Sequence, residues 1–281
     1  MAGKVIVTHI FPDLDAICSI WLLQRFEADF KQATLKFVPA GKTYQGQIVD
    51  SDPTIIHVDT GWGRFDHHQL KERTCAAAQV FNYLKSKKNI SLKYQSALER
   101  MIEVVIQADQ FEDFFWEDPV NDRYEFFLQY LLDNLKLSGN LNDKELVYQG
   151  MALLDGVLFG FRQRILSEEE IKKGVEFETK WGKSLAVETQ MMFDLKLAHK
   201  MGYRLVVRKE PEAGFVSIKS QPKKELDLTP AYAALKKADP QADWFFHQSK
   251  HIISNGSRHN LQVKPSKLSL AEIKEVLTNL K

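Results

Sequence analysis

The stretch KVIVTHIFPDLDAICSIWLLQRFE, residues 4–27, decides the fold class of this 281-residue chain. Its first five residues are rich in β-branched side chains and too few for a buried helix, which predicts a central strand. Polar residues and Pro12 follow, and apolar residues then recur at helical spacing over 16–27. Because a strand that leads directly into such a helix begins a crossover unit, this stretch predicts an α/β fold.

The segments that follow extend the same alternation. Two further strands are expected at 35–38 and 54–58, and two helices at 74–85 and 92–109. Strands and helices at this spacing predict a mostly parallel sheet flanked by helices. In such sheets the functional residues lie just beyond the carboxyl ends of the strands. This chain places most of its His and Asp clusters at those positions.

A shift in composition indicates two domains. We expect a catalytic, metal-binding domain over 1–165, a linker over 166–184 and a smaller α/β substrate-binding domain over 185–281. The linker is charged, and we expect a solvated helix that begins with a capping box formed by Ser167 and Glu170. In the second domain we expect strands at 185–188, 204–208, 215–218 and 244–247, and helices at 191–201, 229–238 and 269–281.

The overall composition excludes several classes of protein. Apolar residues make up 44% of the chain, which is typical of a globular protein. The formal net charge of +1 argues against a protein that binds nucleic acid through bulk charge alone. No apolar run is long enough for a membrane span and no signal peptide is recognisable, so we expect a cytoplasmic protein without a membrane partner. Cys18 and Cys75 form neither a disulfide framework nor a zinc motif.

Four groups of His and Asp residues form the candidate site. Imidazole and carboxylate ligands without thiolates favour Mn²⁺, Mg²⁺ or Fe²⁺. Two carboxylates 4 Å apart repel by about 4 kcal/mol at an effective dielectric constant near 20, so a cluster of them requires a cation if it converges in space. Asp113 is an alternative to Asp109 in the last group. The groups are His9 with Asp13 and Asp15, then Asp59, then Asp66 with His67 and His68, and finally Asp109.

In this order, the residues resemble the motifs of the DHH phosphoesterase superfamily. HIFPDLDAICS (9–19), HVDTG (57–61) and FDHHQ (65–69) match its first three motifs, and Asp109 fits the fourth. TCAAAQVFNYL (74–84) and FFHQSKHIISNGS (245–257) look most like the Myg-type exonuclease branch. The chain departs from that branch in its first motif, where it keeps the Asp-x-Asp form of the wider superfamily.

The resemblance implies a site for two divalent ions, with Mn²⁺ expected and Mg²⁺ or Fe²⁺ as alternatives. One ion would be held by His9, Asp13 and Asp59, and the other by Asp15, Asp59, His68 or His67, and Asp109. Asp59 would then bridge the two ions. Asp66 and His67 are assigned as catalytic residues, and Asp66 would either ligate an ion or orient an imidazole through its second nitrogen.

For the second domain, the resemblance implies a phosphate-binding loop. A glycine allows close approach of the backbone, and serine and arginine side chains can donate hydrogen bonds to phosphate. The expected loop is formed by Ser254, Asn255, Gly256, Ser257, Arg258 and His259. Local positive charge is expected from Arg204, Arg208, Lys209, Lys219, Lys223 and Lys224.

The implied function is that of a metal-dependent phosphohydrolase. We expect a phosphodiesterase or exonuclease on short or single-stranded nucleic acid, with RNA favoured, that uses a water activated by two metal ions. One alternative is a manganese-dependent inorganic pyrophosphatase or nucleotide phosphohydrolase, and a second is a non-catalytic nucleotide-binding protein of the DHH fold. The expected partner is a nucleic acid or nucleotide phosphoester, and a homodimer remains open. The aromatic residues 114–116 could stack bases, but we expect them to fill a core.

Overall fold

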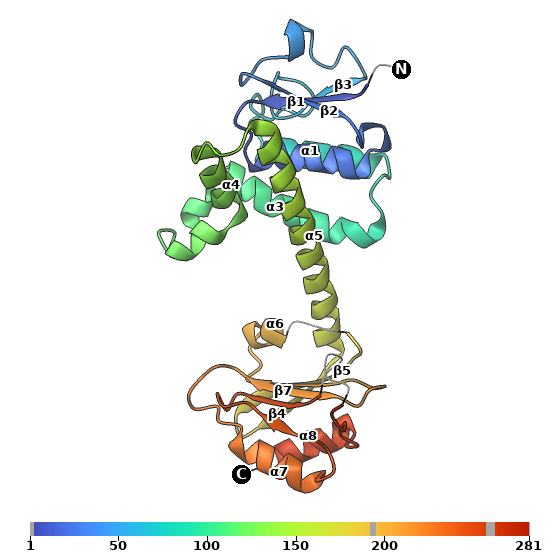
Figure 1. The fold of residues 1–281 in the computed structure, drawn as a ribbon, viewed down its shortest axis with the longest axis vertical. Helices are drawn as coiled ribbons and strands as arrows, with labels where there is room; N and C mark the ends of the chain where they lie inside the picture. Colours follow the sequence, from blue (N-terminus) through green and yellow to red (C-terminus); the bar gives the residue numbers. More distant parts are fainter. Residues whose placement is uncertain (1–2, 192–194, 257–261, 281) are drawn as a thin grey trace. The chain divides into compact units, whose positions relative to one another are not determined.

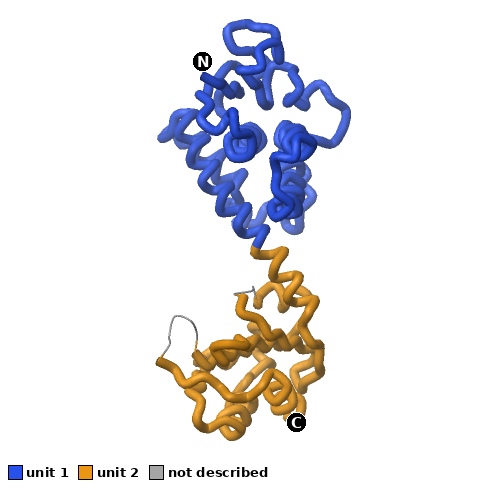
Figure 2. The backbone as a smooth tube through the Cα atoms, turned by 90° about the vertical axis from the view of Figure 1, so that its right-hand side faces the viewer, with its two compact units in different colours: residues 1–162 blue, residues 163–281 orange. Residues whose placement is uncertain are grey.

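The computed structural model describes residues 3–191, 195–256 and 262–280. The chain divides into two compact units, residues 1–162 and 163–281, and the division falls within helix α5, Asp143–Lys173 (Figure 2). No helix in the described ranges is both long and apolar enough to cross a bilayer.

Unit 1 is built on a parallel sheet with the strand order β2-β1-β3. In β1 and β3, Val7 lies opposite His57. Because the strands are parallel, their carboxyl ends meet at one edge of the sheet, and this register brings residues 9 and 59 to adjacent positions there. The strands are β1 (Val5–His9), β2 (Thr34–Val38) and β3 (Ile55–His57).

Helices cover this sheet, and Figure 1 shows α1 and α3 on the same side of it. All residues from Leu14 to Leu23 of α1 are buried, because α2 and α3 also pack against this helix. The α-helices of unit 1 are α1 (Leu14–Phe26), α2 (Ala76–Ser86), α3 (Leu92–Asp109), α4 (Leu128–Leu137) and most of α5. Short 3-10 helices are η1 (Ala28–Phe30), η2 (Tyr44–Gly46), η3 (Glu112–Phe115) and η4 (Asp122–Phe126).

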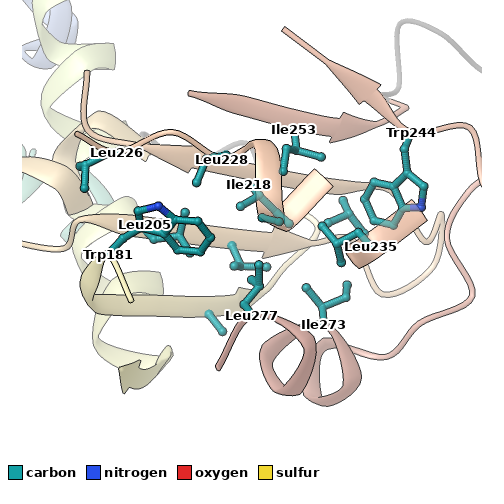
Figure 3. Close-up of a cluster of buried hydrophobic side chains, with 14 of the residues drawn as sticks. Trp181, Leu205, Ile218, Leu226, Leu228, Leu235, Trp244, Ile253, Ile273 and Leu277 are labelled. Carbon is teal, nitrogen blue, oxygen red and sulfur yellow. The ribbon is translucent and has the colours of Figure 1, made fainter. Parts of the chain in front are cut away.

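Unit 2 contains a six-stranded mixed sheet with the order β4-β5-β6-β7-β9-β8. Only β5 and β6 pair in parallel among the described strands of this sheet. Leu235 of α7 and Ile273 and Leu277 of α8 pack into its main core (Figure 3). The strands are β4 (Val175–Thr179), β5 (Gly182–Glu188), β6 (Leu205–Lys209), β7 (Val216–Ser220), β8 (Phe245–Phe246) and β9 (Ile252–Asn255). The helices are α6 (Leu195–Lys200), α7 (Thr229–Ala238) and α8 (Leu270–Thr278).

The α/β fold class predicted from the sequence is confirmed, but residues 166–184 do not form a linker. Helix α5 continues through Ser167, which is buried, so the apparent capping box does not start a helix. Strands β4 and β5 then form an antiparallel hairpin at the edge of the sheet of unit 2. Because β4 is an edge strand whose side chains are exposed or half-buried, its charged residues have the same pattern as those of a solvated segment.

Candidate metal centre

His9 ends β1, and both nitrogens of its ring contact acceptors. Nδ1 lies 2.8 Å from the carbonyl oxygen of Ile10, and Nε2 lies 3.1 Å from Asp59 Oδ2. Burial lowers the pKa of His9, but the hydrogen bonds to Asp59 and to Ile10 outweigh this effect and raise it to about 9. A cation could replace the proton on Nε2 while the bond to Ile10 keeps the ring in place.

Asp59 follows β3 and presents a different oxygen to each of two histidines. Its Oδ2 lies 3.1 Å from His9 Nε2, and its Oδ1 lies 3.4 Å from His67 Nε2. Burial acts to raise the pKa of Asp59, but the contacts with His67 and His9 hold it below its usual value. An ionised carboxylate whose oxygens face two separate imidazoles has the geometry that a bridge between two cations requires.

His67 points its Nε2 atom at three carboxylates. The distances are 3.4 Å to Asp59 Oδ1, 3.5 Å to Asp109 Oδ1 and 3.7 Å to Asp15 Oδ2. Within the described part of the chain, this buried nitrogen and Asp59 Oδ1 have no hydrogen-bond partner. The Asp59 carboxylate is the main cause that raises the pKa of His67 to about 9, against the opposing effect of burial. Buried polar atoms that converge in this way form a group that could hold a cation.

Asp15 is held by the first turn of α2. Its two oxygens accept hydrogen bonds from the backbone N–H groups of Ala76 (2.7 Å) and Ala77 (2.8 Å). Such groups have no partner within their own helix, and the small alanine side chains let α2 approach α1 closely. Burial is the main cause that raises the pKa of Asp15 well above its usual value, followed by the charges of Asp59 and Asp109. A cation at this position would offset the repulsion.

Asp13 is the N-cap residue of α1. Its Oδ1 accepts a hydrogen bond of 3.0 Å from the backbone N–H of Ala16, so the polar requirement of the helix start fixes the side chain. One of its oxygens lies in a group with His9 Nε2 and an oxygen of Asp59. Burial, and then the charge of Asp59, raise the pKa of Asp13, whereas the hydrogen bond from Ala16, the charge of His9 and, last, the charge of Lys136 on α4 act to lower it.

Asp109, rather than Asp113, lies in the cluster. Asp109 ends α3, and Gln110 Nε2 donates a hydrogen bond of 2.9 Å to its Oδ2 while its Oδ1 faces His67. Asp113 instead accepts a hydrogen bond of 2.6 Å from the hydroxyl of Tyr130. It belongs to none of the potential ligand groups formed by the described residues.

Asp66 orients an imidazole, and that imidazole is His68. Asp66 is buried, its Oδ1 lies 2.8 Å from His68 Nδ1, and its Oδ2 accepts a hydrogen bond of 2.8 Å from the backbone N–H of Trp62. The side chain of His68 is 55% exposed, whereas that of His67 is 11% exposed. Either histidine was expected as a ligand, and both belong to potential ligand groups, with His67 among the carboxylates and His68 nearer the surface.

The ligand atoms form three overlapping groups, each within 4.8 Å. Asp59 and His67 each belong to two of the groups. The structure thus brings together all of the side chains that the sequence analysis named as metal ligands. The potential ligand groups of the described residues contain carboxylate oxygens and imidazole nitrogens and no thiol, a donor set that suits Mn²⁺, Mg²⁺ or Fe²⁺. The groups are His9 with Asp13 and Asp59, Asp15 with His67 and Asp109, and Asp59 with His67 and His68.

Three supporting residues were missed in the sequence. Gln110 positions Asp109, and Lys136 acts electrostatically on Asp13. Asp143, at the start of α5, accepts a hydrogen bond of 3.1 Å from the backbone N–H of Phe11. Only Gln110, which adjoins a motif residue, has a signal in the sequence. The other two come from 121–165, a segment without motifs.

Asn255 stabilises unit 2. We expected its side chain to bind substrate, but hydrogen bonds within the unit already occupy it. Its Nδ2 donates hydrogen bonds to the carbonyl oxygens of Asp243 (3.0 Å) and Lys264 (2.9 Å), and its Oδ1 accepts one from the backbone N–H of Ser266. Because both amide protons are used and the side chain is buried, no donor remains for a phosphate.

The other residues of the expected phosphate loop are only partly described. Ser254 lies within β9, opposite Ser217 of β7. Gly256 has a φ of +77°, and a Cβ atom there would lie 2.5 Å from Cδ1 of Phe215, so close packing of this ring requires the glycine. The remaining residues, Ser257, Arg258 and His259, lie outside the described ranges.

The expected positive charge of unit 2 is also reduced. Arg208 is buried and forms an ion pair of 2.7 Å with Glu210. Lys209 is buried too, and its Nζ lies 3.3 Å from the carbonyl oxygen of Ser266. These two residues are therefore not surface charges. Both sides of β6 are covered, which the sequence pattern does not reveal.

Comparisons with known proteins give only distant similarities. No protein family matches the chain, and neither does any curated protein. One similar solved structure is the pGpG-specific phosphodiesterase PggH from Vibrio cholerae, with 14% identity, coverage of 90% of this chain and 92% of that chain, and a TM-score of 0.33. An uncharacterized protein from Helicobacter pylori has 12% identity, coverage of 99% and 100%, and a TM-score of 0.29.

A third similar structure is a DHH domain described as a member of the S1p family of ribosomal proteins. It has 10% identity, coverage of 98% of this chain and 85% of that chain, and a TM-score of 0.31. These TM-scores are too low to support a conclusion about function. The proposed function therefore depends on the chain's own residues.

Proposed function

We propose that this chain is a metal-dependent phosphoesterase of the DHH type that hydrolyses phosphodiester bonds in short or single-stranded nucleic acid, with RNA favoured. The observation that supports it most strongly is the position of Asp59, whose Oδ2 lies 3.1 Å from His9 and whose Oδ1 lies 3.4 Å from His67. A purely structural carboxylate would not need a second oxygen that is buried and without a hydrogen bond in the described part of the chain.

Two divalent ions, Mn²⁺ in the first instance, would share Asp59. One would be held with His9 and Asp13, and the other with Asp15, His67 and Asp109. When bound, such a pair of ions activates a water molecule as the nucleophile near neutral pH and takes up charge on the phosphoryl oxygens.

The chain itself supplies a proton donor at the edge of the site. His68 Nδ1 is held at 2.8 Å by Asp66 Oδ1, which leaves Nε2 as the atom that can carry or release a proton. Because the ring is 55% exposed and lies beside His67, with 4.4 Å between the ring centroids, a substrate can reach it next to the ion cluster. We assign His68 Nε2 as the donor to the leaving oxygen, and Asp66 as the residue that positions it.

An assay of four substrates tests the proposal. Protein loaded with Mn²⁺ is incubated with end-labelled single-stranded RNA, end-labelled single-stranded DNA, an RNA dinucleotide and pyrophosphate. Asp59→Asn removes the proposed bridge, and Asp113→Asn is a matched control because this nearby carboxylate lies outside the ligand groups among the described residues.

We expect nucleotide release by the wild type and by Asp113→Asn, but not by Asp59→Asn. Phosphate release from pyrophosphate alone would overturn the proposed substrate and favour a pyrophosphatase. Absence of turnover in protein that also binds no Mn²⁺ would overturn the enzyme assignment and favour a nucleotide-binding protein.

A further inference from the structure

Three exposed aromatic residues lie in the loops that carry the proposed metal ligands. Phe11 lies two residues after His9, Trp62 three residues after Asp59, and Phe111 two residues after Asp109. Their exposed fractions are 61%, 58% and 79%. Because each residue adds at most about 3.6 Å to the length of the chain, the Cα atom of each of these residues lies within about 11 Å of the Cα atom of a proposed ligand. We call these three residues the aromatic rim.

The backbone of each rim residue has a conformation that favours glycine. The φ angles are +57° for Phe11, +62° for Trp62 and +57° for Phe111, and no other Phe, Tyr or Trp in residues 3–191, 195–256 and 262–280 has a positive φ. For a bulky side chain this region is a genuine outlier, whereas glycine adopts it freely. Backbone preference therefore does not explain aromatic residues at these three positions.

Burial does not explain them either, because each ring is more than half exposed. Phe111 follows the last turn of α3, where glycine is the usual residue at the end of a helix. Hydrogen bonds hold the other two loops, since the backbone N–H of Phe11 donates to Asp143 (3.1 Å) and that of Trp62 donates to Asp66 (2.8 Å). Strained conformations that the surroundings maintain occur preferentially at functional sites.

Two contacts connect Trp62 to the site. Its ring centroid lies 6.4 Å from that of His68, whose Nδ1 lies 3.7 Å from Asp59 Oδ1. Asp66 binds the backbone of Trp62 with one oxygen and the ring of His68 with the other, so a single buried carboxylate fixes the backbone at Trp62 and the ring of His68. A Cβ atom at Gly41 would lie 3.5 Å from Nε1 of Trp62, which shows that the indole rests against this glycine.

We propose that the aromatic rim stacks the nucleobases on either side of the phosphate bound at the metal centre. This inference rests on the proposed function and adds to it the residues that would bind the bases of the substrate. Stacking on aromatic side chains accepts every base because each has a π face. Trp62, which lies beside the proton donor His68, would contact the base nearest to the bond that is cleaved.

Glycine substitutions test the rim, because glycine retains the positive φ while removing the ring. Trp62→Gly, Phe11→Gly and Phe111→Gly are compared with the wild type on an adenine dinucleotide and on the same dinucleotide phosphodiester without bases. We expect each substitution to raise KM for the dinucleotide by about 10-fold and to leave KM for the abasic compound unchanged. Phe126→Ala is the control, since Phe126 is 83% exposed but lies outside the motif loops and has no positive φ.

Binding without turnover separates this proposal from the proposed function. Adenosine monophosphate is titrated into Mn²⁺-loaded protein while tryptophan fluorescence is measured. We expect quenching in the wild type and in Trp116→Phe, and its loss in Trp62→Gly. If quenching depends on Trp62 but no substrate is cleaved, the result supports base binding by the aromatic rim and contradicts the proposed function.

Two results would contradict the proposed role of the aromatic rim. The first is cleavage of the dinucleotide with wild-type KM values in all three glycine variants, together with quenching that Trp62→Gly retains. The second is a wild-type dimer that dissociates in the glycine variants, with unchanged KM values, because the exposed rings would then form a contact between copies of the chain.

Discussion

His67 Nε2 lies 3.4 Å from Asp59 Oδ1, and both atoms are buried without a hydrogen-bond partner in the described part of the chain. In the metal-free protein this contact is favourable while His67 carries a proton, and a cation that replaced the proton would satisfy both atoms. Asp15 and Asp109 approach the same nitrogen with further oxygens at 3.7 Å and 3.5 Å. A divalent ion would satisfy all of these atoms at once, which is why we propose that the cluster is a metal centre.

The stability of the metal-free protein should fall as the pH rises. The folded state raises the pKa of His9 and of His67 to about 9 from an ordinary value of 6.5. Their contribution to the free energy of unfolding is therefore fully present below pH 6.5 and is lost as the pH rises toward 9. Urea unfolding in the presence of EDTA should show a midpoint that decreases across this interval, and His67→Gln should reduce the decrease.

Mn²⁺ should reverse this dependence. The ions replace the protons on these two nitrogens, so the apparent affinity for Mn²⁺ should increase between pH 6.5 and 9, and the stabilisation by a fixed Mn²⁺ concentration should increase with it. Unfolding midpoints measured with and without Mn²⁺ check this prediction. An equal shift at pH 6.5 and pH 9 would contradict the assignment of these histidines as ligands.

Asp66→Asn should reduce turnover while the protein still binds its ions. The substitution weakens the contact that holds His68 Nδ1 at 2.8 Å, and loss of a residue that orients an imidazole typically reduces activity by about 10- to 100-fold. We expect lower kcat, an altered pH profile of kcat and an unchanged Mn²⁺ content. Loss of Mn²⁺ in this variant would instead make Asp66 a ligand.

Asp109→Asn and Asp113→Asn form a direct comparison between two nearby carboxylates. Asp109 lies 3.5 Å from His67, whereas Asp113 is bound by the hydroxyl of Tyr130. We expect Asp109→Asn to weaken Mn²⁺ binding by at least about 10-fold, since even outer residues of metal sites have effects of this size. Calorimetric titration with Mn²⁺ measures it, and equal affinities in the two variants would remove Asp109 from the site.

Asn255→Ala should destabilise unit 2 without changing the metal centre. Among the described residues, the substitution leaves the carbonyl group of Asp243 and the N–H of Ser266 without a partner, whereas the carbonyl of Lys264 still accepts a hydrogen bond from the backbone N–H of Asp243. Unpaired buried groups reduce stability by about 1–3 kcal/mol each. We expect a lower unfolding midpoint and an unchanged Mn²⁺ affinity. If stability is unchanged but KM rises, Asn255 binds substrate after all.

The sequence predicts the convergence of these His and Asp side chains because several of them follow short strands directly. His9 and Asp59 come after β1 and β3, and parallel strands bring such positions to one edge of a sheet. Helix α3 is predicted with its observed bounds because its apolar stripe has a regular period. The ring to which Asp66 binds was not predictable, since the choice between His67 and His68 depends on rotamers within a turn.

The second unit is harder to predict because its signals are ambiguous. Strand β4 lies at the edge of its sheet with exposed or half-buried side chains, so it lacks the alternating pattern of a half-buried strand.

The burial of the aromatic residues 114–116 in unit 1 was also only partly predictable. Trp116 packs against Tyr124 and Phe127, with 5.5 Å between ring centroids, but Phe114 and Phe115 are exposed.

The most direct test of the account is the number of Mn²⁺ ions bound per chain, measured by metal analysis after equilibrium dialysis. We predict two ions in the wild type. In Asp59→Asn we predict that affinity falls for both ions, because this side chain contacts His9 with one oxygen and His67 with the other. Asp113→Asn should retain two ions. A wild type that binds a single ion, or an Asp59→Asn variant that still binds two with wild-type affinity, would contradict the proposed bridged centre.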